Sequence, residues 1–200
     1  TLDGEGQSAE GTLQGLHVRQ PKKMHRSSLT GRSVPSKRAG AAPQVDLSNP
    51  NSWPLGNVAL EKGFTTDAAG NAQVVATLAA GMYRVKLETQ DRFGKTVTAE
   101  LPLQVLDPDA KKLALKVPSL VAAPRWLLQP GDTFSCLWGS GYDDARAFIE
   151  IEHRNKVVLS YWTDPGTSQT TITRKVTEAM RGGFTVRITM VRENRAYFES

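Results

Sequence analysis

Apolar and polar side chains alternate with a period of two along three stretches of this chain. Every odd-numbered residue from Val97 to Val105 is apolar, and the residues between them are Thr98, Glu100, Pro102 and Gln104. The same alternation runs through residues 83–88 and 184–190. Because successive side chains of a strand point to opposite faces, each stretch predicts a strand with one buried and one solvated face.

Turn sequences separate these stretches at short intervals. They are 67–71 (Asp-Ala-Ala-Gly-Asn), 91–94 (Asp-Arg-Phe-Gly), 130–132 (Pro-Gly-Asp) and 164–166 (Asp-Pro-Gly). Strands punctuated in this way are typical of β-sandwiches. Only Val176–Met180 resembles a helix, and Gly182 and Gly183 follow it at once. The sequence therefore predicts an all-β chain.

Thirteen strands are expected, in two sets. The first set is Thr12–Arg19, Val58–Thr65, Ala72–Leu78, Met82–Thr89 and Thr96–Leu106. The second set is Leu113–Val117, Val121–Leu128, Thr133–Gly139, Arg146–His153, Val157–Thr163, Thr170–Val176, Phe184–Arg192 and Arg195–Phe198.

A polar joint at 107–110 (Asp-Pro-Asp-Ala) divides the 200 residues into two predicted domains, 1–108 and 109–200. The second holds enough strands for a complete sandwich, whereas the first is short of its N-terminal strands. The sequence begins at Thr1 without an initiator Met or a signal segment, so we expect it to belong to a longer protein. No run approaches the ~18–20 apolar residues of a membrane helix.

Positive charge is concentrated in one segment. Residues 11–45 contain seven Lys and Arg and no acid, and the rest of the chain carries 18 bases against 20 acids. The part from Met24 to about residue 52 is rich in Ser, Gly, Ala and Pro, which predicts a long solvated basic loop inside the first domain. It lacks the interleaved aromatics of a single-stranded nucleic-acid arm, so no specific nucleic-acid partner is expected.

Residues 78–83 (Leu-Ala-Ala-Gly-Met-Tyr) match the pattern of a tyrosine corner. In Greek-key sandwiches the Tyr at the start of a strand hydrogen-bonds through its hydroxyl to backbone a few residues upstream. The pattern predicts this role for Tyr83. It concerns topology and carries no chemistry.

Each chemically suggestive residue also has a structural interpretation, which we favour. Cys136 is the sole cysteine, so the chain has no internal disulfide, and His17, His25 and His153 show no third group that would orient them beside it. Ser140 does not match the Gly-x-Ser-x-Gly nucleophile elbow, because Trp138 and Tyr142 stand where its glycines belong. Asp143 and Asp144 fit turn chemistry better than a calcium loop, and Glu150 and Glu152 share a solvent face rather than a cleft.

The large aromatic side chains of the second domain form one further candidate group. Trp126, Trp138, Tyr161 and Trp162 are compatible with a sugar-stacking platform, but we expect them to pack in the core or between domains. The sequence therefore predicts that the chain is not an enzyme and uses no cofactor. It offers no catalytic, cofactor-binding or metal-binding residue.

Several segments together resemble a known family. Residues 130–134 (Pro-Gly-Asp-Thr-Phe) are similar to a strand entry of macroglobulin domains, and the strands from Phe148 to Arg195 resemble the domain that leads into the bait region of bacterial alpha-2-macroglobulin-like proteins. Phe64–Ala72, Gly81–Arg84 and Asp91–Gly94 are similar to the preceding domain of the same family.

The resemblance implies two tandem fibronectin-III/immunoglobulin-like macroglobulin sandwiches of a secreted or periplasmic peptidase trap, whose parent protein is in some cases membrane-anchored. Its partners would be neighbouring macroglobulin domains and, through the complete protein, target peptidases. Cys136 is followed by Leu137 and Trp138, not by the Gly-Glu-Gln of the family's thioester. The alternatives are a carbohydrate-binding module or a cell-surface adhesion or spacer module, since one sandwich fold serves many functions.

Overall fold

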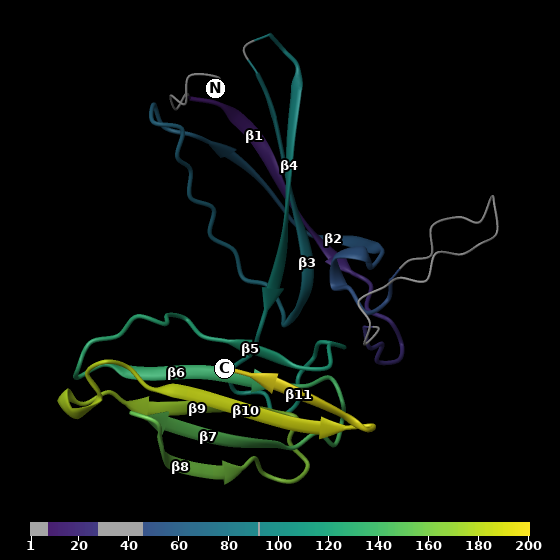
Figure 1. Ribbon diagram of the computed structural model, residues 1–200. Coiled ribbons are helices and arrows are strands. Elements are labelled where there is room, and N and C mark those ends of the chain that lie inside the picture. Colours follow the sequence, from purple (N-terminus) through teal and green to yellow (C-terminus); the bar gives the residue numbers. More distant parts are fainter. Residues whose placement is uncertain (1–7, 28–45, 92) are drawn as a thin grey trace, which may run out of the picture. The chain divides into compact units, whose positions relative to one another are not determined.

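The computed structural model describes residues 8–27, 46–91 and 93–200 (Figure 1). The prediction of an all-β chain is confirmed, because antiparallel strands in three sheets form nearly all of the regular structure. The chain divides into two compact units. Unit 1 comprises residues 1–20 and 36–106, and unit 2 comprises residues 21–35 and 107–200.

Unit 1 contains one four-stranded antiparallel sheet with the order β2-β1-β3-β4. Its strands are β1 (Glu10–Val18), β2 (Leu55–Thr65), β3 (Gly81–Gln90) and β4 (Thr96–Val105). A short 3₁₀ helix, Pro50–Ser52, precedes β2. Trp53 follows it, and its buried indole donates a hydrogen bond to the Leu47 carbonyl at 2.9 Å.

The two faces of this sheet differ in polarity, as the alternation in the sequence requires. The register aligns Leu13 with Leu87, and Leu87 with Ala99, on one face. On the other face, Lys86 and Glu100 are paired across β3 and β4 and form an ion pair at 3.1 Å. Leu101, opposite Val85 on the apolar face, is 62% exposed, so part of that face has no cover among the described residues.

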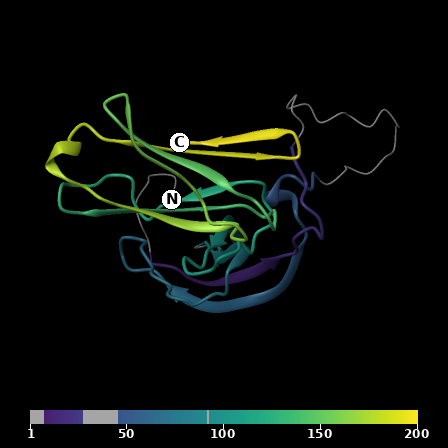
Figure 2. The ribbon, with the colours of Figure 1, turned by 90° about the horizontal axis from the view of Figure 1, so that it is seen from below.

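Unit 2 contains two antiparallel sheets, an arrangement consistent with a β-sandwich. One has the order β5-β6-β9, with β5 at Leu120–Ala122, β6 at Thr133–Gly139 and β9 at Gln169–Lys175. The other has the order β11-β10-β7-β8, with β7 at Ala147–His153, β8 at Lys156–Trp162, β10 at Thr185–Arg192 and β11 at Arg195–Glu199. Figures 1 and 2 show β10 and β11 as a hairpin along one side of this unit.

The core of unit 2 lies between these sheets. Trp138 and Ile172 come from β6 and β9, and Ile149, Ile188 and Met190 come from β7 and β10; each is at most 2% exposed. Dispersion contacts and the removal of these side chains from water supply most of the favourable free energy of such a core.

Three expected strands are absent or shortened. Residues 72–78 form no strand and pair with none of the described strands. Residues 113–117 also form none, although Leu113, Leu115 and Val117 are buried in the alternation that suggested one. The strand expected at 121–128 shrinks to Leu120–Ala122. The alternation of apolar residues indicates which side chains are buried. A side chain can be buried without its backbone pairing with a neighbouring strand. The other ten expected strands occur within about three residues of their predicted bounds.

The tyrosine corner is confirmed in its geometry. The hydroxyl of Tyr83 donates a hydrogen bond of 2.9 Å to the carbonyl of Ala79, four residues upstream, and the side chain is buried. The ring of His17, its neighbour on β1, meets it edge to face at 5.3 Å.

Tyr83→Phe should therefore lower the free energy of unfolding of unit 1 by about 1–1.5 kcal/mol, because it removes the hydrogen bond between the hydroxyl of the buried Tyr83 side chain and the Ala79 carbonyl. Hydrogen exchange along a denaturant series, read from fragments of β1 and β3, measures this loss. Fragments of β6 and β9 are the internal control and should not change. An unshifted unit 1 would show that the hydrogen bond adds nothing to stability.

Candidate functional site

A segment that precedes the first gap in the described residues packs on unit 2. We call residues 21–27 the strap. It belongs to unit 2, although β1, which ends at Val18, belongs to unit 1. The predicted solvated loop at about 24–52 therefore differs from the structure at its start, because Met24 is half-buried and packs against the core of unit 2. Residues 28–45 of that loop lie outside the described residues.

Met24 reaches the core because the residue that it packs against, Gly141, has no side chain. Its methyl group lies against Gly141, where a Cβ would collide with both that methyl group and the Leu115 carbonyl. Gly141 is held in place by its own N–H, which donates to the Val117 carbonyl at 2.8 Å. Any larger residue at position 141 would force either Met24 or the backbone to move.

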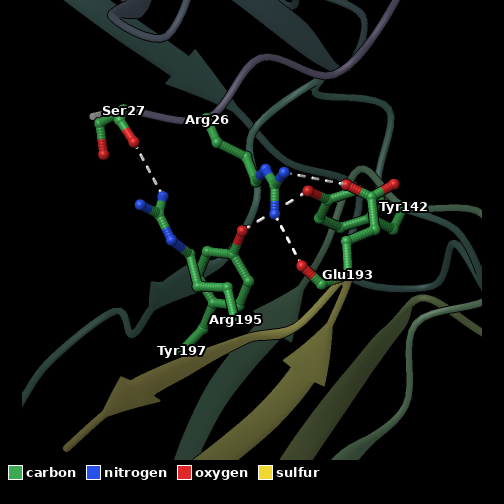
Figure 3. Close-up of polar contacts among 6 residues, drawn as sticks. All are labelled: Arg26, Ser27, Tyr142, Glu193, Arg195 and Tyr197. Carbon is green, nitrogen blue, oxygen red and sulfur yellow. Dashed lines mark hydrogen bonds and ion pairs between the residues drawn. The ribbon is translucent and has the colours of Figure 1, made fainter. Parts of the chain in front are cut away.

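Two arginines fix the end of the strap to the β10–β11 hairpin (Figure 3). Arg26 donates to the Glu193 carbonyl at 2.9 Å and lies 3.7 Å from the carboxylate of the same residue. In return, Arg195 donates to the Ser27 carbonyl at 2.9 Å. These side chains are partly exposed, so the ion pair contributes little, and the contacts mainly set the position of the strap.

Two tyrosines lie beneath this contact. The hydroxyls of Tyr142 and Tyr197 are 3.5 Å apart, and Figure 3 shows Arg26 next to both. Burial raises the pKa of Tyr142, and the Tyr197 hydroxyl and the Glu193 carboxylate raise it further. Arg192 stacks on the Tyr142 ring at 5.8 Å. Tyr142 therefore stays a neutral phenol well above physiological pH, and the arrangement is suited to holding the strap rather than to proton transfer.

Cys136 lies in the core of unit 2 at 1% exposure, between the side chains of both sheets. Burial raises the pKa of its thiol from 9.0 to about 11. His153 is occupied elsewhere, since its Nδ1 lies 2.8 Å from the Gly183 carbonyl. His17 contacts Tyr83 in unit 1, and His25 belongs to the strap. The structure thus gives Cys136 the surroundings of an unreactive thiol.

The other polar candidates have structural contacts. Ser140 is fully buried, and its hydroxyl donates to the Pro118 carbonyl at 2.7 Å and accepts from the Tyr142 N–H. Asp144 pairs with Arg192 at 2.9 Å, and Glu152 pairs with Arg187 at 3.1 Å. Within the described ranges, no three His, Cys, Asp or Glu residues gather as metal ligands would.

The expected burial of the four aromatic residues holds for only part of the group. Trp138 is fully buried and Tyr161 packs on the core, but Trp126 and Trp162 are 60% and 56% exposed. Trp162 lies at the end of the edge strand β8, where it contacts Phe148 and Arg146. Trp126 lies in the loop after β5 and tilts onto Phe134. The prediction that all four pack away from solvent is therefore wrong for these two.

Beneath Trp126 the two sheets leave an opening into the core, which we call the open pocket. Its volume is about 600 Å³. Its apolar lining is Val121, Trp126, Leu128, Pro130, Phe134, Cys136, Val176, Met180, Phe184, Val186 and Ile188. Arg181 and Glu199 are its charged residues. This size and lining fall within the range of ligand pockets, and sequence reasoning missed it because it depends on how far two distant sheets separate.

The chain matches no protein-family model, and no curated protein matches it significantly.

Met24→Ala should lower the free energy of unfolding of unit 2 by about 1 kcal/mol, because it removes a half-buried side chain from the core. Hydrogen exchange along a urea series, read from fragments of β6 and β9, measures this change. Lys23→Ala is the matched control, since Lys23 is the exposed neighbour in the strap and its truncation should change little. Equal effects of the two substitutions would contradict the packing role of Met24.

Alkylation of Cys136 by iodoacetamide at pH 8 should be about 100-fold slower in the folded chain than in urea, because the raised pKa lowers the fraction of the thiol that is present as thiolate. The rate should rise with pH up to about 11, where the thiolate forms. Mass spectrometry of the modified peptide measures both. Equal rates in the folded and unfolded chain would mean that the thiol is accessible.

Proposed function

We propose that this chain is a non-catalytic structural part of an alpha-2-macroglobulin-like peptidase inhibitor. In this proposal, residues 1–108 and 109–200 are tandem macroglobulin β-sandwiches, and the second precedes the bait region. Among the described residues the first shows one sheet, and its residues 21–27 pack on the second. The complete inhibitor would act outside the cell or in the periplasm, with neighbouring macroglobulin domains and target peptidases as partners.

The strand layout of unit 2 is the observation that carries the proposal. Seven strands in sheets of three and four, with the orders β5-β6-β9 and β11-β10-β7-β8, agree with a fibronectin-III-like topology. The tyrosine corner at Tyr83 supports a Greek-key origin for unit 1 as well. Neither observation distinguishes macroglobulin domains from other sandwiches, so the family itself depends on the sequence resemblance.

The way the chain connects the units also suits a structural role. The chain leaves unit 1 after Gln20, contributes the strap to unit 2, and enters unit 2 again after Leu106. Two units that share segments in this way are joined by more than one linker. Cys136 is meanwhile packed in the core, and Ser140, Asp144 and Glu152 are engaged in hydrogen bonds or ion pairs. In the part of the chain that the structure describes, no helix is long and apolar enough to cross a membrane.

A carbohydrate-binding module is the second candidate, because Trp126 and Trp162 are exposed. These residues lie on elements of different sheets, whereas a sugar platform needs its aromatics in one line. A glycan array separates the candidates, since a macroglobulin module should bind none of the glycans.

The isolated 200-residue chain should not protect a large protein substrate from trypsin and should not hydrolyse peptide, ester or glycoside substrates. It contains no thioester sequence, and entrapment needs the complete inhibitor. Digestion of casein by trypsin, with and without the chain at equimolar and tenfold excess, tests this expectation. Stoichiometric protection of casein would contradict the proposal.

The positive test uses the complete product of the gene. Exposure to several peptidases of different specificity should give cleavage within one short region and a more compact particle, seen as faster migration in native gels. Cleavage scattered along the chain without compaction would overturn the proposal.

A further inference from the structure

The strand β8 forms one edge of unit 2, at the opposite side of its sheet from β11. It pairs with β7 along Lys156–Trp162, and among the described residues no strand pairs with its other side. Figure 1 shows β8 along one side of this unit. The strands before and after it in the sequence, β7 and β9, both have their places in the two sheets, so this edge is bounded by described segments of the chain.

The pairing of β8 with β7 shows which backbone groups the edge leaves open. The N–H of Thr163, just after the strand, donates to the Ala147 carbonyl at 2.9 Å and therefore points toward β7. Because this direction alternates along an antiparallel strand, the N–H and C=O groups of Ser160 and Trp162 point away from β7. The register is irregular only before this stretch, where Val158 has no partner in β7.

β8 lacks the features that commonly prevent sheet edges from pairing with another chain. From Val157 to Trp162 it contains no charged residue, no Pro and no Gly, and most of its apolar side chains are exposed. The edge strands β2, β4 and β9 do carry such features, namely Glu61, Lys62, Glu100, Pro102, Arg174 and Lys175. An uncharged and exposed edge strand is a template for a further strand.

The open edge of β8 is complementary to a second copy of itself. In an antiparallel pair centred on Tyr161, Ser160 of one copy lies opposite Trp162 of the other, and each such pair can exchange two backbone hydrogen bonds. The two side chains lie on the same face of the sheet, so the large indole would cover the small side chain of Ser160. Contacts with Phe148 and Arg146 already orient this indole.

The charges at the two ends of β8 favour the same arrangement. Lys156 is the first residue of the strand, and Asp164 follows shortly after its end. Neither side chain forms an ion pair with a described residue. Antiparallel pairing brings the start of one strand beside the end of the other, within the reach of a lysine side chain. Opposite charges would therefore meet at both ends of the pair.

We propose that β8 is a homodimer interface, in which the β8 strands of two copies of this chain pair antiparallel about Tyr161 and join two sheets into one. The contact uses the same surface on both copies, so it closes at the dimer. It covers only one strand edge, which is less than the ~1,200 Å² of a standard interface, and the dimer should be weak and reversible. The inference does not depend on the proposed function, because it uses the edge of unit 2 alone.

The first test is sedimentation equilibrium of the 200-residue chain between about 10 μM and 1 mM, where a weak dimer becomes populated. Ser160→Pro should weaken dimerisation at least about ten-fold, because it removes a donor that points away from β7, and proline is tolerated at such a position of an edge strand. Ser160→Thr is the matched control. It keeps the donor and should still dimerise.

The second test is a charge reversal at the ends of the strand. Lys156→Asp and Asp164→Lys should each weaken the dimer at least about three-fold, because like charges then meet at both ends. The double variant has opposite charges again and should dimerise as the original chain does. These substitutions leave Ser160 unchanged, so they decide the question if Ser160→Pro fails to fold by circular dichroism.

Three results would overturn the inference. The first is a chain that stays monomeric over the whole concentration range. The second is a folded Ser160→Pro variant that dimerises as tightly as the original chain. The third is a double charge variant that dimerises no better than the single variants, which would place the contact between copies elsewhere on the chain.

Discussion

The contact between the apolar faces of two sheets in unit 2 is the interaction on which the rest of that unit depends. Trp138, Ile149 and Ile188 are shielded from water because their strands turn these side chains toward the core between the two sheets. A shift of one residue in the register of any of these strands would exchange the two faces. The two-residue turn at Glu193 and Asn194 fixes the register of β10 and β11. The pocket, the strap contact and the tyrosine pair all follow from this alignment.

Strands with a simple alternation could be predicted from the sequence. β3, β4 and β10 lie within about one residue of their expected positions because apolar and polar side chains alternate along each of them. The stretch at 113–117 obeys the same rule without a ladder. Its alternate residues are buried although they belong to no strand, and the sequence does not distinguish a buried strand from a buried segment without strand pairing.

The strap could not be predicted, since its contacts are set by residues more than a hundred positions away. Arg26 meets Glu193, and Met24 meets Gly141. Only weak signals were present: Met24 stands alone as a large thioether in a polar, basic run, and Gly141 lies between Ser140 and Tyr142 without an evident turn type. The exposure of Trp126 was missed for a related reason, because an aromatic residue suits a core and a pocket rim equally well.

The membership of the strap in unit 2 makes that unit a discontinuous domain. A fragment cut from residue 107 onward would hold every strand from β5 to β11 and would still lack one of the side chains that fill its interior. Conversely, a fragment that ends at residue 106 would carry Met24 with no surface to bury it. Cutting the chain before residue 107 therefore gives two fragments. The first exposes the Met24 thioether, and the second exposes the hollow in its core that Met24 fills.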